Sequence, residues 1–147
     1  MDRPESAVEY MRSGFNCAHS VVKAFASELN VPEDAAVKMA TPFGGGFGRR
    51  GFVCGALSGA GLVIGARFGN CIPADTAARD KAYAAVGELL EKFSHEHGAV
   101  FCRELIGIDL RNPEEMKRAR EEGIFTNRCS LFVRSAGRIL EEILAAG

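Results

Sequence analysis

Apolar residues recur along most of the chain at spacings of three and four, which is the pattern of helices that bury one face. Asn16 is a suitable N-cap for a helix over about 16–29, and a short helix is predicted before it, over Pro4–Ser13. The longest apolar stripe extends over Asp75–His97 and is followed by Gly98, a residue that commonly ends helices. The first two thirds of the chain therefore predict mainly helices.

Two further helices are predicted near the carboxyl end. Asn112 and Pro113 start a short charged helix to about Glu122, and the last helix runs over about Cys129–Ala145. No stretch alternates apolar and polar residues as a half-buried strand does, and no Asn-Gly or Asp-Gly hairpin turn occurs. We therefore expect an all-α fold, a compact single-domain bundle of about five to seven helices over residues 1–147.

One segment differs from the rest in its glycine content and charge. Ten of the 17 glycines lie between Thr41 and Cys71, and no Asp or Glu occurs from Ala35 to Ala74. Its first part, Pro42–Gly48, must be irregular, because each glycine costs a helix about 1 kcal/mol relative to alanine.

The second part of this segment, Phe52–Ala66, is uncharged and almost wholly apolar. It predicts a central helix buried on all sides. The pairs Gly55/Gly59 and Gly61/Gly65 have the spacing that lets another helix approach closely. Since a membrane-spanning helix needs roughly 20 residues, we expect no membrane insertion.

Composition and charge narrow the class of protein. The 147 residues carry 18 basic and 19 acidic side chains, and 47% of them are hydrophobic, as in one packed globular domain. Matched charges and the lack of Trp argue against a nucleic-acid partner. The amino-terminal stretch lacks the apolar run of a secretory signal, so we expect a cytoplasmic protein.

Cysteine is the main source of candidate chemistry. The chain contains five cysteines, an odd number, and permanent disulfides are rare in a reducing compartment. Four of them lie in or near a predicted first helical turn, namely Cys17, Cys54, Cys102 and Cys129. Unpaired backbone N–H groups at such a turn stabilise a thiolate. We expect Arg49 and Arg50 to reinforce this effect at Cys54.

Two kinds of site remain open from the residues alone. No C-x-x-C pair occurs, so any site must be assembled by packing of helix ends. Four such cysteines can hold a metal ion or an iron-sulfur cluster, and a pair can form a reversible disulfide. The alternative is that the cysteines only fill small apolar spaces, since cysteine is among the most buried residue types.

Other candidate motifs carry less weight. The run Gly46–Gly51 satisfies G-x-G-x-x-G, but no strand precedes it, so it does not predict a dinucleotide site; an anion at its two arginines is the weaker interpretation. His95 and His97 are two apart on a helix and are expected on a solvated face. His19 is expected to point away from Cys17. A cysteine-nucleophile enzyme would need one of these histidines as its base.

The combination of motifs resembles a known family. Those motifs are Cys17, Gly44–Gly51, Cys54–Gly59, Cys102–Leu105 and Cys129. Together they are similar to the redox-active family named for its C-GCAxxG-C-C pattern, over about Ala7–Leu144. The resemblance implies a small all-helical bacterial or archaeal protein whose four cysteines are redox-active or ligate a metal centre. Similar domains fused to haem-binding modules favour electron transfer. The order here is Cys-Gly-Ala rather than Gly-Cys-Ala, and Cys71 has no counterpart.

The leading hypothesis is thus a cytoplasmic redox protein with an unknown redox partner. Its four cysteines hold an iron-sulfur cluster or other metal, or cycle between dithiol and disulfide. Cys54 is expected to be the most reactive thiol, with Arg49, Arg50 and Gly55 beside the cofactor. The alternative is a helical binding or scaffolding module with structural cysteines. A homodimer through helix faces fits either reading.

Overall fold

The computed structural model describes residues 1–147, and every regular element in it is helical. The elements are α1 (Arg3–Arg12), α2 (Cys17–Ala24), η1 (Ala26–Glu28), α3 (Glu33–Ala40), η2 (Thr41–Phe43), α4 (Gly44–Phe47), α5 (Gly55–Phe68), α6 (Thr76–His97), α7 (Cys102–Ile106), α8 (Pro113–Glu121) and α9 (Ile124–Ala146). The predicted all-α fold is confirmed, with slightly more helices than the five to seven expected.

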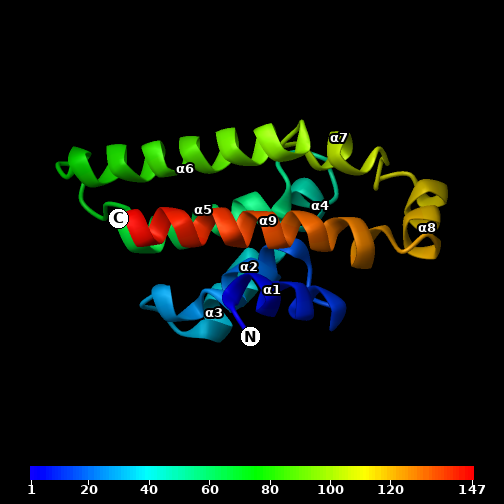
Figure 1. Cartoon of the computed structure of the whole chain (residues 1–147), viewed down its shortest axis with the longest axis horizontal. Helices are drawn as coiled ribbons and strands as arrows, with labels where there is room; N and C mark the ends of the chain where they lie inside the picture. Colours follow the sequence, from blue (N-terminus) through cyan, green and yellow to red (C-terminus); the bar gives the residue numbers. More distant parts are fainter.

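The helices form three layers around α9. Figure 1 shows α6 along one side, α9 and α5 through the middle, and α1 to α3 on the other side. Helix α9 packs against α1, α2, α5 and α6. The largest fully buried side chains include Phe25, Ile64, Leu89, Phe93, Ile139 and Leu140. Since these come from both sides of α9 and from α9 itself, the apolar core is continuous around that helix.

Helix α2 crosses α5 at very short range. A Cβ atom at Gly59 would lie 2.8 Å from the carbonyl oxygen of Ala18, closer than real Cβ atoms come to other atoms. The predicted close approach at Gly55 and Gly59 is therefore confirmed. Gly61 and Gly65 face open space instead, and the end of α5 near Gly65 is exposed. The prediction that this helix is buried on all sides is wrong for its last turns.

Two helix boundaries differ clearly from the sequence-based prediction, and one helix was not predicted. The helix expected over 16–29 stops at Ala24, because Phe25 has a non-helical backbone with φ −106° and ψ 24°. Helix α3 was not predicted. Helix α9 begins at Ile124, about five residues before the expected start, since Gly123 in the left-handed conformation connects it directly to α8.

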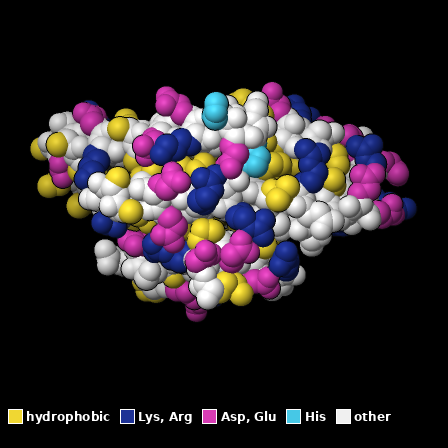
Figure 2. Space-filling view, in the orientation of Figure 1, with side chains coloured by type: hydrophobic (Ala, Val, Ile, Leu, Met, Phe, Trp, Pro, Cys, Tyr) yellow, Lys and Arg dark blue, Asp and Glu magenta, His cyan; other side chains and the backbone are white.

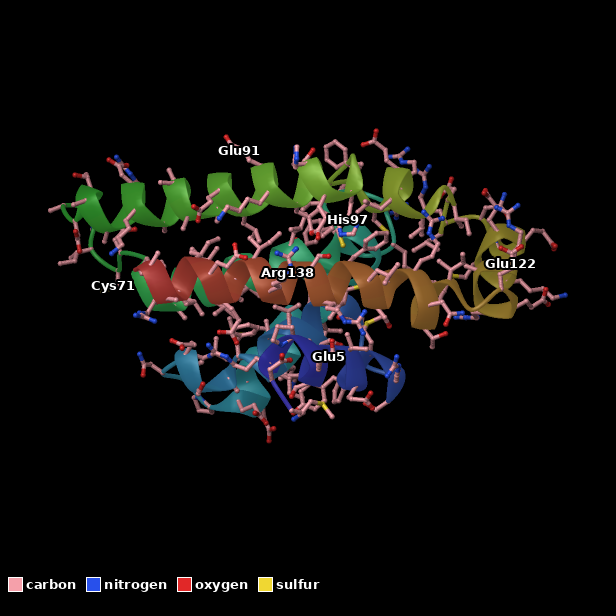
Figure 3. The ribbon with its side chains drawn as sticks, in the orientation of Figure 1. Glu5, Cys71, Glu91, His97, Glu122 and Arg138 are labelled. Carbon is pink, nitrogen blue, oxygen red and sulfur yellow. The ribbon has the colours of Figure 1, made fainter.

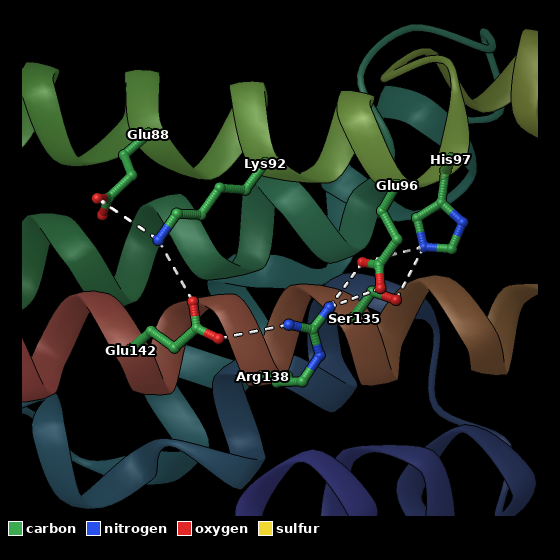
Figure 4. A network of polar contacts seen from close by, with 7 residues as sticks. All are labelled: Glu88, Lys92, Glu96, His97, Ser135, Arg138 and Glu142. Atoms are coloured by element: carbon green, nitrogen blue, oxygen red, sulfur yellow. Dashed lines mark hydrogen bonds and ion pairs between the residues drawn. The ribbon is translucent and has the colours of Figure 1, made fainter.

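Ion pairs line the seam between α6 and α9 (Figure 4). Arg138 of α9 donates to both carboxylate oxygens of Glu96 on α6, at 2.6 and 2.7 Å. One turn further along, Lys92 of α6 lies 3.3 Å from Glu142 of α9. Such exposed pairs contribute little stability each. These pairs join the two long helices at two successive turns.

His97 belongs to this seam and corrects a prediction. Its Nε2 lies 2.8 Å from the Oγ of Ser135, and its ring packs against Phe93 and Phe132 with centroids 4.6 and 5.1 Å away. The expectation of a solvated face is wrong for His97, because α9 covers that face of α6. It holds for His95, which is exposed.

The surface carries no extended region of one charge on the face drawn in Figure 2, where acidic and basic side chains are intermixed. None of the helices combines the length and the apolar content that crossing a membrane requires.

Candidate functional site

The glycine-rich segment forms a left-handed helical turn. Five consecutive residues, Gly45 to Arg49, have φ angles between 64° and 71°. This conformation costs an L-residue roughly 1–2 kcal/mol, whereas glycine adopts it freely. Three of the five residues are glycine, and only Phe47 and Arg49 bear the cost. The expected irregular segment is thus an ordered turn that requires its glycines.

The turn packs directly against a cysteine. A Cβ atom at Gly46 would lie 2.8 Å from the Cβ of Cys102 and 2.6 Å from the backbone nitrogen of Phe52. The N–H of Phe52 donates to the carbonyl of Gly46 at 2.9 Å, which closes the turn. Any side chain at position 46 would therefore displace Cys102.

A short antiparallel contact places two of the cysteines. The backbone before α5 runs beside the backbone before α7, with Val53 and Phe101 as the bridge pair. The N–H of Cys54 and the N–H of Cys102 each donate to a carbonyl of the opposite segment, at 2.9 and 2.6 Å. Because alternate residues of extended backbone point to opposite faces, Cys54 and Cys102 share the face opposite the bridge pair.

Three of the four expected helix-start positions are confirmed. Cys17 is the first residue of α2, Cys102 is the first residue of α7, and Cys54 is the N-cap of α5. The prediction is wrong for Cys129, because α9 begins at Ile124 and so carries Cys129 in its second turn.

The fold brings these four thiols together around Cys17. A hydrogen bond with Cys129 is the largest cause that raises the pKa of Cys17, and burial adds to it. Burial raises the pKa of Cys102 to about 12, with a further contribution from the nearby Cys17. Burial also raises the pKa of Cys54 well above its usual range, again with a contribution from Cys17. Cys17 thus interacts with each of the other three.

The expected lowering of the Cys54 pKa is wrong in direction. Backbone N–H groups of Ala56 and Leu57 do favour its thiolate, as a helix start should. Burial outweighs them, because the side chain is only 4% exposed. Arg49 and Arg50, by contrast, are exposed to solvent. Cys54 is therefore a protonated, enclosed thiol at neutral pH.

A cavity opens beside the cluster. It has a volume of about 600 Å³, within the range of small-molecule sites. Its wall contains Cys17, Cys102 and Cys129, and it also contains Arg49 from the left-handed turn. We call it the cysteine cavity. Neither Cys54 nor Arg50 lines it, so of the two adjacent arginines only Arg49 contributes to the cavity wall.

His19 has a structural role that the sequence did not reveal. Its Nδ1 accepts a hydrogen bond from the N–H of Asn16 at 3.2 Å, so Nε2 carries the ring proton and donates to the Oγ1 of Thr41 at 2.8 Å. Burial lowers the pKa of His19, which keeps the ring neutral. Both ring nitrogens are occupied, and His19 is not placed to act as a base. The predicted N-cap at Asn16 is confirmed.

The fifth cysteine is remote from the others. Cys71 is exposed in the connection between α5 and α6, at the end of the molecule opposite α8 in Figure 3. It has no part in the cluster. No three His, Cys, Asp or Glu side chains are arranged as ligands of one metal ion.

Comparison with known proteins supports the resemblance noted from the motifs. A family model described as "Putative redox-active protein (C_GCAxxG_C_C)" matches residues 15–143. That range contains all four clustered cysteines and the left-handed turn. Comparisons with curated proteins and with solved structures found no match.

Proposed function

The chain belongs to the C_GCAxxG_C_C family of redox-active proteins, and from the arrangement of its thiols we propose that Cys17 and Cys129 cycle between a dithiol and a disulfide. The single observation that carries this proposal is that Cys17 and Cys129 are neighbours in the wall of one cavity of about 600 Å³. A reducing compartment such as the cytoplasm would keep the pair reduced until an oxidant reaches it.

We assign the two sulfurs different roles. The neighbouring Cys129 and burial raise the pKa of Cys17, so Cys17 keeps its proton at neutral pH and Cys129 is the attacking sulfur in this proposal. As a thiolate, Cys129 attacks one sulfur of an acceptor disulfide, forming a mixed disulfide and releasing one thiolate. Cys17 then loses its proton and attacks the sulfur of Cys129, which releases the second thiolate. Two electrons pass from the pair to the acceptor, and the proton of Cys17 passes to one of the two released thiolates.

The other two thiols support this pair. Cys102 lines the same cavity, but with a pKa of about 12 it is protonated at neutral pH and does not attack. Cys54 lies outside the cavity wall and is buried. Neutral thiols at these positions leave the charge of the attacking Cys129 without a competing thiolate nearby.

A metal or iron-sulfur centre for electron transfer is the second candidate. The observation in its favour is that Cys17 interacts with Cys54, Cys102 and Cys129 at once. Thiolates are the usual ligands of such centres. The side chains would have to rearrange, since no three are arranged as ligands. Metal and acid-labile sulfide content of protein purified without oxygen tests this candidate directly.

The dithiol is tested by counting thiols. Denatured, reduced protein should show five titratable thiols. After mild oxidation of the folded protein the count should fall to three, and peptide mapping should find Cys17 linked to Cys129. Cys71→Ser should lower both counts by one and leave the disulfide intact. An unchanged count would show that the pair does not cycle and that these thiols only pack, and a link between other cysteines would overturn the pairing of Cys17 with Cys129.

A further inference from the structure

We propose that the cysteine cavity binds a small disulfide carrying carboxylate groups, and that this anionic molecule is the acceptor for the Cys17–Cys129 pair. The inference rests on the proposed dithiol cycle and names the class of molecule that reacts with it. It follows from the charge, the free guanidinium groups and the apolar wall of the cavity.

The charge of the cavity differs from that of the whole chain. Its wall contains three arginines, Arg12, Arg49 and Arg120, and no Asp or Glu. The chain as a whole has 18 basic and 19 acidic residues. A wall with one sign of charge concentrates ligands of the opposite sign. The cavity is therefore selective for anions.

Two of these guanidinium groups have no acidic partner within the protein. Arg12 donates to Glu9 at 2.6 Å, so its charge is partly neutralised. Arg49 and Arg120 take part in none of the ion pairs or side-chain hydrogen bonds of the structure, although most other arginines do. A guanidinium group binds a carboxylate with two parallel hydrogen bonds. Arg49 and Arg120 are thus available to a bound carboxylate.

The rest of the wall suits an elongated, partly apolar molecule. Its apolar members are Met11, Phe15, Leu110, Met116 and Phe125. Sulfur atoms make favourable contacts with aromatic rings, and flexible methionine side chains adapt to the shape of a bound molecule. With three cysteines in the same wall, a disulfide bond can lie against the thiols while its carboxylates lie against Arg49 and Arg120. The volume of about 600 Å³ accommodates such a molecule.

The reaction balances without another reactant. The thiolate of Cys129 attacks the bound disulfide, the S–S bond breaks, and one acidic thiol leaves as its thiolate. Cys17 gives up its proton and closes the protein disulfide, releasing the second thiolate. The protein dithiol is oxidised by two electrons, and one disulfide is reduced to two thiols.

Three disulfides of nearly equal size but different charge test the inference. They are 3,3′-dithiodipropionate with two negative charges, bis(2-hydroxyethyl) disulfide with none, and cystamine with two positive charges. The rate of loss of protein thiols is measured with each at low and at high salt. We expect dithiodipropionate to react about tenfold faster than cystamine at low salt, with a smaller ratio at high salt.

Substitutions locate the selectivity. The double variant Arg49→Gln with Arg120→Gln should lower the rate with dithiodipropionate relative to the rate with cystamine about tenfold, which removes the preference. The matched control is Arg50→Gln with Arg118→Gln, because both arginines are neighbours of the tested residues but lie outside the cavity wall. The control should keep the ratio of the original protein.

The outcomes separate the inference from the function on which it rests. Equal rates for the three disulfides would overturn the anion site and leave the dithiol cycle in place. A preference for dithiodipropionate that survives in the double variant would also overturn it, because the selectivity would then come from elsewhere. No oxidation by any of the three would overturn both the site and the cycle.

Discussion

The Cβ of Cys17 faces Gly55 so closely that a Cβ at Gly55 would lie 3.2 Å from it and 2.8 Å from the carbonyl oxygen of Phe43. The glycine of the family motif thus sets how near α2 comes to the start of α5. It thereby sets the distance between Cys17 and Cys54, the residue before Gly55. The motif that contains Cys54 therefore also provides, at Gly55, the space that Cys17 occupies.

Alanine at the two contact glycines of α5 should destabilise the fold. Gly55→Ala or Gly59→Ala forces α2 away, at a cost of about 1–3 kcal/mol in free energy of unfolding. Gly61→Ala has no neighbour to displace and should stabilise α5 by about 0.5–1 kcal/mol. Urea unfolding under reducing conditions measures both effects. If Gly59→Ala proved as stable as Gly61→Ala, the close contact between α2 and α5 would not affect the free energy of unfolding.

The left-handed turn should be sensitive at one glycine more than at another. Gly46→Ala places a Cβ in the left-handed conformation and against Cys102 and Phe52, so it should lower the free energy of unfolding by about 2–5 kcal/mol. Gly48→Ala should lower the free energy of unfolding by only about 1–2 kcal/mol, because nothing lies within 4 Å of its added Cβ. Thermal unfolding gives the order of the two variants. Equal losses would mean that the turn does not press on Cys102.

Oxidation of the proposed pair should stabilise the folded chain. A disulfide between Cys17 and Cys129 closes a loop of more than a hundred residues, which typically contributes about 2–4 kcal/mol by restricting the unfolded chain. Urea unfolding with and without reductant measures the difference. Cys17→Ser and Cys129→Ser should each abolish it, whereas Cys71→Ser should retain it. A reductant-independent midpoint in the oxidised protein would contradict the pairing.

Stability should fall at alkaline pH. Burial raises the pKa of Cys102 to about 12, and the pKa of Cys54 is also raised. Above about pH 8.5 the unfolded chain releases these protons while the folded chain keeps them. The stabilisation is complete below that pH and is lost as the pH rises towards 12, by about 1.4 kcal/mol per pH unit per cysteine.

The contribution of Cys102 to the loss of stability at alkaline pH can be measured by substitution. Urea unfolding of the reduced protein between pH 7 and 10 should show a shallower decline in Cys102→Ala than in the unaltered chain. Cys71→Ser serves as the control, because Cys71 is exposed and should leave the decline unchanged. Identical slopes for all three proteins would refute the burial of a protonated Cys102.

Helical periodicity and local residue chemistry made much of this fold predictable. The apolar stripe of α6 ends at Gly98, and the N-caps Asn16 and Asn112 begin α2 and α8 as expected. These features depend on residues within a few positions of one another. The choice of four cysteines over Cys71 also came from the sequence, through motif and helix-start placement.

What sequence reasoning missed depends on contacts between distant segments. The backbone pairing that holds Cys54 beside Cys102 joins positions 48 residues apart, and no local pattern encodes it. The pKa of Cys54 was expected to fall because Arg49 is near it in sequence, but burial by other helices decides the direction. The left-handed conformation of the turn at Gly45 to Arg49 was also not predictable, because a run of glycines indicates an irregular backbone but not which conformation it adopts.

The bridge before α5 and α7 has a further consequence for variation of the sequence. Its hydrogen bonds join main-chain atoms only, so the positions of Cys54 and Cys102 do not depend on which side chains flank them. Phe52 and Phe101, at 50% and 46% exposure, are free to be replaced by other residues without moving either sulfur. Substitutions at these two positions should therefore change the surface beside the cluster and leave the thiol geometry as it is.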